Sequence, residues 1–543
     1  MRKSIISCLL VILFACTAIT VSAKTIYVSS SGSDTSNGTS SSPFATLSAA
    51  YKALSGDTDI ILLDSASFVN PPAHSGKLTL KGNTSSVTLT LPSETILAGQ
   101  LKFDNLTLNT GTIYANGHTL EISSTVTSTG AIAVFGGKKG ASFAGNTDIR
   151  LYGGQYSSVF GGCNGGTVNG NTNVIFGGNA KQSGALYIYG GSSNAAVNGT
   201  STVTLEGNAQ CTYIFGAGNG ANGTARVTDI YIKGGNVVEA VYGGANSATA
   251  TNKGAVYNIT MTGGKTQAIF GGNIGSSVNG HTFVNLLGGE VTRRVYTGCY
   301  NNATNKLFSY SYDTDYHVIG TTVLRIAPGP NLITGSDGNR GIFSGSRTKS
   351  QHDEEQNTII YLDNCYNTYS KKIGEKSGFY TSSFKSHHDY VVNAGSGGDV
   401  LGTKTAGKVY IAPDRWKYAT IGSNKYYNQE ATVSSNTTVS FTKAFNINSV
   451  IAVGSEKNAY ITADVTIENM SNEPTPTLFV GLYDGTRCIA ASFKKTPSSD
   501  SALSLVLPFD YKSDKIYTVK VMLTNNKLSP LSSQVQTNLK YST

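Results

Sequence analysis

The chain contains few charged residues, since Asp, Glu, Lys and Arg together make up 13% of its 543 residues, which is about half of the usual share. Uncharged polar side chains must therefore provide most of its solubility. The formal net charge is +9, and cleavage of a signal carrying Arg2 and Lys3 would lower it by two. The remaining excess is too dispersed to indicate nucleic-acid binding, although it permits attraction to anionic polymers.

Cysteine is also scarce, with seven in the chain. Two of them, Cys8 and Cys16, lie in the N-terminal apolar segment. The other five are widely spaced and form neither a disulfide framework nor a paired-Cys metal motif: Cys163, Cys211, Cys299, Cys365 and Cys488. We expect them to be buried thiols.

The only long apolar run is at the N-terminus. Arg2 and Lys3 precede an apolar run over residues 5–15, and small residues lead to Ala23. This run is too short to span a membrane and predicts a secretory signal over residues 1–23. Lipoprotein processing at Cys16 is the alternative, although Phe14 fits such a site poorly. We therefore expect a secreted, extracellular monomer without a transmembrane segment, associated with the cell surface non-covalently if at all.

Glycine is abundant, at 62 residues, and it recurs in a fixed motif within residues 131–300. Strand-like segments there end in an aromatic residue followed by small residues, and the aromatics lie 25 to 29 residues apart: Phe135, Phe160, Tyr189, Phe215, Tyr242, Phe270 and Tyr296. Between them lies a second alternating segment that ends in glycine, as in residues 202–207. Such a period is typical of a solenoid, propeller or array, in which no unit can bury its apolar face alone.

The repeat favours a parallel β-helix among these architectures. Its apolar residues alternate with period two, which argues against helical repeats, and a propeller blade needs roughly 40 residues or more. A repeat of about 27 residues fits a rung of two or three short strands, stacked on the next rung at about 4.8 Å. We expect the aromatics to stack as an internal ladder that fills the core. The alternative is a row of aromatics that binds sugar rings or bases.

Residues 24–56 form an N-terminal unit with a strand at 26–28 and a predicted helix at 43–54, with Ser42 as N-cap and Pro43 in the first turn. A family resemblance rests on four stretches: Tyr27-Val28-Ser29, Gly32-Ser33-Asp34, Gly38-Thr39 and Ser42-Pro43-Phe44-Ala45-Thr46-Leu47. They resemble the opening of secreted bacterial right-handed β-helix proteins with the pectin-lyase-like fold. The resemblance implies that the helix covers the end of the solenoid, and it is specific for fold rather than for activity.

The β-helix is expected over residues 57–431, with a loop-rich insert at about 296–390. The insert holds ten of the 30 tyrosines and four of the seven histidines. Insertions in a solenoid emerge as loops on one face, and functional residues concentrate on such loops. We therefore expect the functional site in this insert.

Several chemistries fit the polar clusters of the insert. A glycosidase needs two carboxylates beside the scissile bond, and a uronate lyase needs a base with a cation or arginine; the candidate catalytic residues are Asp313, Asp315, Glu354, Glu355 and His388. Calcium needs several oxygen ligands, and the candidates are Asp313, Asp315 and Asp353. Sugar recognition uses ring stacking and hydrogen bonds, for which the candidates are Tyr312, Tyr316, His317, Arg325, Tyr366 and Tyr390. A solvated loop is the alternative for each cluster.

Residues 432–543 change character and predict an antiparallel β-sandwich. Strand patterns recur at 437–441, 459–469, 477–483, 488–493, 502–507 and 515–523. Together with Ser529-Pro530-Leu531-Ser532, they resemble a C-terminal module of bacterial secreted and surface proteins. That resemblance implies attachment or spacing rather than catalysis.

Three functions remain open from the sequence. The first is non-catalytic binding of an extracellular polysaccharide or surface glycan, without a cofactor other than a possible Ca²⁺. The second is a polysaccharide lyase or glycoside hydrolase on the same fold, for which an acidic polysaccharide is one candidate substrate. The third is an architectural or adhesive surface protein. Fold alone does not separate them, and no lyase signature matches the chain residue by residue.

Overall fold

The structure is a computed structural model of the whole chain, and between residues 357 and 443 it describes mainly strand backbone. The described residues are 23–248, 253–300, 316–327, 329–334, 341–343, 346, 357–363, 388–393, 400–402, 407–411, 417–426, 429–433, 438–443, 445–467, 476–496, 501–525, 532 and 534–541.

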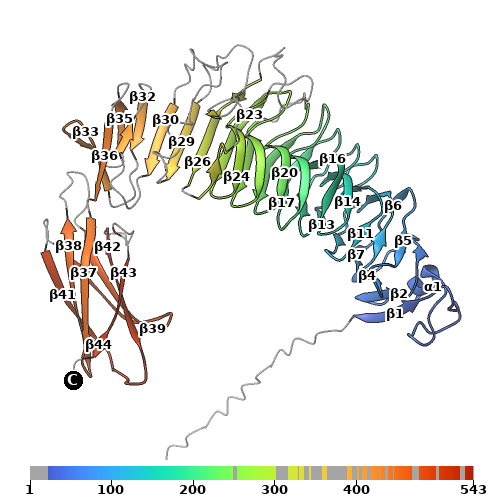
Figure 1. Cartoon of the computed structure of the whole chain (residues 1–543), viewed down its shortest axis with the longest axis horizontal. Helices are drawn as coiled ribbons and strands as arrows, with labels where there is room; N and C mark the ends of the chain where they lie inside the picture. The colour runs from blue at the N-terminus through green and yellow to red at the C-terminus, as the bar shows by residue number, and fades with distance from the viewer. Residues whose placement is uncertain are drawn as a thin grey trace, which may run out of the picture.

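Parallel strands stacked rung on rung form most of the molecule, and this confirms a β-helix (Figure 1). The longest sheet, sheet 1, pairs its strands in parallel in the order β1 (Lys24–Val28), β2 (Thr58–Leu62), β4 (Lys77–Gly82), β7 (Gln100–Asp104), β10 (Leu120–Ile122), β13 (Thr147–Leu151), β15 (Thr172–Phe176), β17 (Val197–Leu205), β19 (Ala225–Ile232), β21 (Ala255–Met261), β23 (Val278–Leu286), β26 (Thr321–Ile326), β29 (Asn357–Asp363), β30 (His388–Asn393) and β32 (Gly407–Ile411). The short β25 (Val318–Ile319) also pairs with β23.

A second parallel sheet, sheet 2, forms another side of the same rungs. Its strands follow the order β6 (Glu94–Ile96), β9 (Gly111–Tyr114), β12 (Ile132–Phe135), β14 (Gln155–Phe160), β16 (Lys181–Tyr189), β18 (Gln210–Phe215), β20 (Asn236–Tyr242), β22 (Lys265–Phe270) and β24 (Glu290–Tyr296), after which β27 (Asn331–Leu332) and β28 (Gly341–Phe343) both pair with β24. A small third sheet joins β3 (Ala66–Ser67), β5 (Thr88–Thr90), β8 (Thr107–Leu108) and β11 (Thr127–Ser128) in the first rungs.

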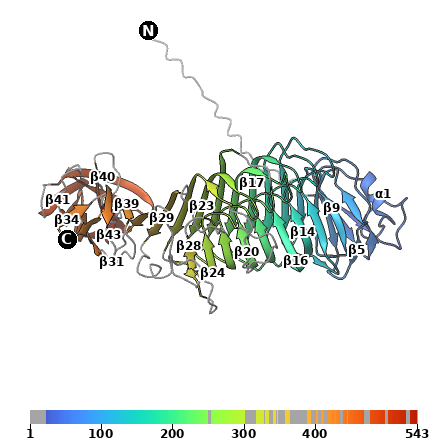
Figure 2. The same ribbon diagram turned by 90° about the horizontal axis from the view of Figure 1, so that it is seen from above.

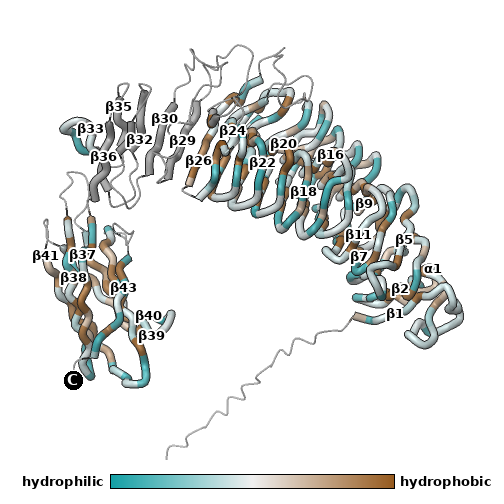
Figure 3. The backbone as a smooth tube through the Cα atoms, viewed as in Figure 1, coloured by the Kyte–Doolittle hydropathy of each residue, from teal (hydrophilic) through white to brown (hydrophobic). Residues whose placement is uncertain are grey.

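Apolar side chains between the sheets form one continuous core from Ile26 to Ile342. In Figure 3, hydrophobic and hydrophilic residues alternate along the strands of the rungs, which is the period-two pattern that the sequence predicted.

The repeated aromatics stack as a ladder, as expected, but the ladder does not fill the main core as predicted. Neighbouring rings are nearly parallel, with centroids 4.5 to 5.3 Å apart, from Tyr114 through each predicted aromatic to Tyr296. Each ladder ring follows a residue that points into the main core, such as Ile214 before Phe215, so the ladder lies on the opposite side of sheet 2 as a separate buried cluster.

A glycine follows six of the ladder aromatics, from Phe135 to Phe270, and it is required by the close approach of the next rung. A Cβ atom on Gly161 would lie 2.2 Å from the carbonyl oxygen of Gly190, and one on Gly216 would lie 2.2 Å from that of Gly243. Buried hydroxyls on sheet 1 also bind these corners. Thr172 donates to the carbonyl of Gly190, and Thr228 donates to that of Gly243, each at 2.6 Å.

The N-terminal helix α1 (Leu47–Lys52) is shorter than predicted. Thr46, rather than Ser42, is the N-cap, and its Oγ1 accepts a hydrogen bond from the backbone of Ala49. Residues 43–44 do not start the helix because Phe44 forms a parallel bridge with Val28. The carboxylate of Asp34 accepts hydrogen bonds from both the backbone and the hydroxyl of Thr46. The buried side chains of α1 join the main core, and α1 lies at the first rung (Figure 2).

Beyond the parallel rungs the strands become antiparallel. β32 pairs antiparallel with β35 (Gln429–Val433). A separate four-stranded sheet joins β31 (Val400–Gly402), β36 (Thr438–Lys443), β33 (Lys417–Ile421) and β34 (Asn424–Tyr426). The predicted strand at 437–441 therefore belongs to this sheet and not to the sandwich, because β36 pairs with β31 and β33.

Two four-stranded sheets form the C-terminal β-sandwich around one apolar core. One sheet contains β41 (Ser501–Pro508), β38 (Asn458–Ile467), β37 (Phe445–Gly454) and β44 (Lys540–Tyr541), and the other contains β40 (Arg487–Lys495), β39 (Thr477–Asp484), β42 (Tyr517–Thr524) and β43 (Val535–Asn538).

Cysteines follow the expectation in three of the four positions described. Cys163, Cys211 and Cys299 are buried, whereas Cys488 is exposed on β40. Cys365 lies outside the described residues. In the part of the chain that the structure describes, no helix combines the length and apolar character needed to cross a bilayer.

Candidate functional site

Most of the residues predicted for the site lie outside the described residues: Tyr312, Asp313, Asp315, Asp353, Glu354, Glu355 and Tyr366. His388 and Tyr390 lie on β30, whose backbone aligns them with Thr358 and Ile360 of β29. The convergence of these residues in one cleft remains a prediction. Within the described ranges no group of three or more His, Cys, Asp or Glu side chains could hold a metal ion, and the calcium ligands proposed from the sequence fall outside those ranges.

Three other predicted residues are described, and they have different surroundings. Tyr316 packs against a small buried cluster that includes Val278 and Val318. The backbone N–H of His317 donates to Ser277 Oγ at 3.0 Å. Arg325 is exposed on β26. The structure therefore does not place Arg325 in the apolar cluster that holds Tyr316.

A different group of polar and aromatic side chains gathers on the side of sheet 2 that carries the ladder. We call it the tyrosine face, and it consists of Tyr187, Tyr213, Glu239, Gln267 and Arg293 on the successive strands β16, β18, β20, β22 and β24. All five side chains are partly exposed. The stacking of the rungs brings them together, although they are spread over more than a hundred residues of sequence.

Tyr187 and Tyr213 form the aromatic part of this face. They align across β16 and β18, and their ring centroids lie 5.0 Å apart with 24° between the ring planes. Each precedes a ladder ring by two residues, so it points to the same side of the strand. The rings therefore form a second, short stack beside the buried ladder, with Tyr187 6.2 Å from Tyr189.

Glu239 introduces a carboxyl group beside these rings. Burial raises its pKa above the ordinary value, and the charge of Arg293 offsets part of this increase. The pKa of Tyr213 is also raised, first by burial and then by the charge of Glu239. A partly desolvated carboxyl beside a phenol can accept hydrogen bonds from hydroxyls or, when protonated, donate one.

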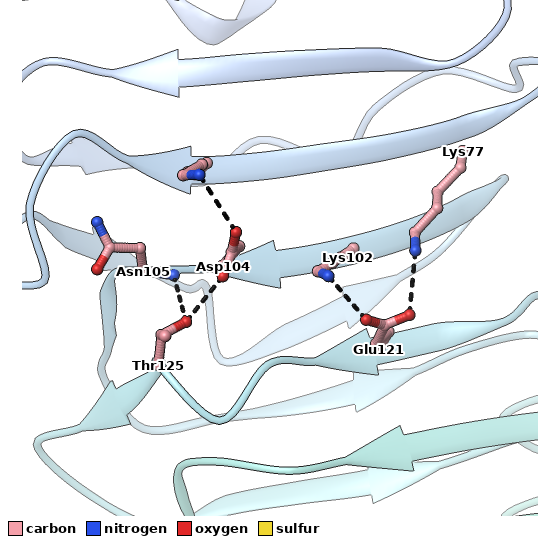
Figure 4. A network of polar contacts seen from close by, with 7 residues as sticks. Lys77, Lys102, Asp104, Asn105, Glu121 and Thr125 are labelled. Carbon is pink, nitrogen blue, oxygen red and sulfur yellow. Dashed lines mark hydrogen bonds and ion pairs between the residues drawn. The ribbon is translucent and has the colours of Figure 1, made fainter. Parts of the chain in front are cut away.

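A charged network on the first rungs is the second polar cluster (Figure 4). Glu121 of β10 bridges Lys102 at 2.9 Å and Lys77 at 3.0 Å, and the carboxylate of Asp104 accepts a hydrogen bond from Thr125 at 2.7 Å. Burial alone would raise the pKa of Glu121, but the hydrogen bonds from Lys102 and Lys77 outweigh it and lower the pKa. The charges of this network pair with one another across three strands, so the network stabilises the stacking of these rungs. Its carboxylates, Glu121 and Asp104, are already engaged by these partners and are not candidates for catalysis.

The sequence reasoning missed Tyr187 and Tyr213, because it treated the repeat as structural and searched for function in the insert. The signal was present. In two adjacent repeats a tyrosine stands two positions before the ladder aromatic, as in Tyr187-Ile188-Tyr189 and Tyr213-Ile214-Phe215. Alternation places both aromatics on one side of the strand.

No protein-family model matches the sequence, and no curated protein matches it. Among solved structures, two crystal structures of a glycosyl hydrolase family 2 member from Bacteroides cellulosilyticus each match 26% of this chain with a TM-score of 0.16, at 7% and 9% sequence identity. The match spans about a quarter of their length, 26% and 24%. Similarity this low establishes neither a shared fold nor a shared function.

Proposed function

We propose that this protein is extracellular and binds a polysaccharide or surface glycan, without catalysis, through the tyrosine face of its β-helix. The observation that carries the proposal is the partly exposed stack of Tyr187 and Tyr213 beside hydrogen-bonding side chains. Sugars present apolar ring faces together with hydroxyls, so they are suited to aromatic rings bordered by polar groups.

The arrangement of the face supports a polymeric ligand. Its side chains come from five successive strands of a parallel sheet, where neighbouring strands lie about 4.8 Å apart. Polar groups there are already oriented by the protein. Gln267 donates to the carbonyl of Val238 at 2.7 Å, and Thr212 donates to Gln182 at 2.7 Å. Binding groups held in place in this way lose little side-chain entropy when a ligand binds.

Affinity electrophoresis of the chain from residue 24 onward, in gels that contain one soluble polysaccharide each, tests the proposal. At least one polymer should retard the protein, and the Tyr187→Ala/Tyr213→Ala double variant should lose at least tenfold in affinity. Tyr231→Ala is the matched control, because Tyr231 is 37% exposed on sheet 1, away from the tyrosine face. Equal retardation of all three proteins would refute the assignment, and no retardation by any polymer would favour the architectural alternative.

A polysaccharide lyase or hydrolase is the second candidate, and the raised pKa of Glu239 is the observation that favours it. A carboxyl group whose pKa is raised is better suited to act as a general acid than one with an ordinary pKa. Unsaturated products, followed by ultraviolet absorbance, and new reducing ends would be measured with the same polymers, with and without calcium. Product formation that disappears in Glu239→Gln would establish catalysis at this face.

A further inference from the structure

The position two residues before each ladder aromatic forms a column of its own along sheet 2, which we call the outer column. Strand register aligns its members in the order Thr112, Ala133, Ser158, Tyr187, Tyr213, Ala240, Ala268 and Arg294. Two neighbouring members carry aromatic rings, and small residues flank this pair on both sides. Each small residue leaves a place where a ring could continue the stack.

The two flanks of the ring pair differ in solvent access. On the Tyr213 side, Ala240 and Ala268 are completely buried, and the ring of Tyr300 packs nearby with its centroid 4.5 Å from that of Phe270. On the Tyr187 side, Ala133 and Ser158 remain partly exposed, and the adjacent Ser157 is exposed. Solvent therefore reaches the outer column beside Tyr187, on the side of its ring opposite Tyr213. We call this space above Ser158 the slot.

The spacing of the rungs fits a ring-shaped ligand in the slot. The ladder next to it already holds rings at centroid distances of 4.9 Å for Phe135 and Phe160 and 4.5 Å for Phe160 and Tyr189. Strand spacing sets this repeat, so a ring above Ser158 would lie at stacking distance from Tyr187. The ligand would complete a column in which the protein supplies only two rings.

The lining of the slot indicates the charge of the ligand. Ala133, Ser157 and Ser158 are uncharged. Of the cations on adjacent rungs, Lys139 is paired with Glu94 at 2.6 Å, Lys138 lies over the ring of Phe143 at 5.8 Å, and Lys181 aligns with Gln155 at the start of β16. An uncharged ring with an apolar face and a hydroxyl rim matches a tyrosine face bordered by serine hydroxyls, whereas a carboxylate would lose hydration without gaining a cationic partner.

We propose that the slot binds a neutral pyranose ring of the glycan, stacked on the free face of Tyr187 above Ser158. This inference rests on the proposed glycan-binding function and specifies its ligand class and its subsite.

Filling the slot tests the inference. Isothermal titration would use the chain from residue 24 onward with cellohexaose, mannohexaose, xylohexaose and a galacturonic acid hexamer. Ser158→Tyr adds the missing ring from the protein itself, so it should weaken binding of the neutral hexasaccharide at least tenfold. Thr202→Tyr, on the outer side of sheet 1 between Asn173 and Asp229, makes the same change on a strand far from the slot and should bind as wild type does. Circular dichroism would verify the fold of each variant.

The outcomes separate the slot from the proposed function. If wild type and Ser158→Tyr bind the same neutral hexasaccharide equally, the slot is wrong while glycan binding stands. Preference for the galacturonic acid hexamer overturns the neutral assignment. If wild type binds no glycan, both proposals fail. If Ser158→Tyr does not fold, Ala133→Leu and Tyr187→Leu test the same proposal. Each variant should bind the neutral hexasaccharide at least tenfold more weakly than wild type. Wild-type affinity in both variants would overturn the proposed binding at the slot.

Discussion

Removal of one ring from the middle of the buried ladder should destabilise the rungs around it strongly. Phe215 is 2% exposed, and its ring stacks between Tyr189 at 5.0 Å and Tyr242 at 4.9 Å. Replacement of a buried Phe by Ala costs about 3–5 kcal/mol, and this range includes the loss of contacts with neighbouring side chains. Because neighbouring rungs hold the ring on both sides and cannot easily collapse, we expect Phe215→Ala to cost about 4–5 kcal/mol.

Ile96→Ala is the matched control, since Ile96 aligns with Tyr114 at the beginning of the same column but is 46% exposed. It should cost less than about 1 kcal/mol. Native-state hydrogen exchange is the suitable assay, because a repeat protein opens locally and a single global transition is not assured. Protection of strands β16, β18 and β20 should fall in Phe215→Ala. A loss of stability below about 2 kcal/mol, or one equal to that of Ile96→Ala, would refute a stabilising role of the stacked rings.

Three further predictions follow from buried or paired polar groups. Thr228→Val removes the hydroxyl that donates to the carbonyl of Gly243 at 2.6 Å and should cost about 1–3 kcal/mol in urea denaturation; an unchanged midpoint would contradict the role of this hydrogen bond. The pKa of Glu121 is lowered below the ordinary 4.5 in the folded state, so its stabilising effect is present above that pH and is lost as pH falls through the folded-state pKa. Glu121→Gln should therefore lower the melting temperature at pH 7 and make it less sensitive to acid. Melting temperatures of wild type and variant that change in parallel with pH would contradict this. The pKa of Glu239 is raised, so its ionised form opposes folding as pH rises. Glu239→Gln should therefore melt at or above the wild-type temperature at pH 7, and at the wild-type temperature at pH 4. A variant that melts below wild type at pH 7 would count against desolvation as the cause of the raised pKa.

Features that repeat were predictable from the sequence. The alternation of apolar residues and the aromatic period predicted the parallel rungs and the stack from Phe135 to Tyr296, because every rung meets the same packing constraint. The start of α1 was not predictable from capping preference alone. Ser42 and Thr46 are both good N-caps, and the bridge between Phe44 and Val28 decides between them.

Features that do not repeat along the chain were not predicted from the sequence. Strand β37 was missed because a register shift between Ile447 and Ser449 interrupts its alternation. The tyrosine face was missed because Tyr187 and Tyr213 occur in only two of the repeats, and the repeat as a whole was interpreted as structural. The carboxylates chosen from the insert, such as Asp313 and Glu354, remain a prediction, because they lie outside the described residues and outside the regular repeat.

A crystal structure of the chain from residue 24 onward, soaked with the hexasaccharide that binds best, tests the central claim most directly. The account predicts a sugar ring above Ser158, parallel to the ring of Tyr187 and continuing the stack that Tyr187 forms with Tyr213. A saccharide bound elsewhere, with the surface beside Tyr187 bare, would contradict it.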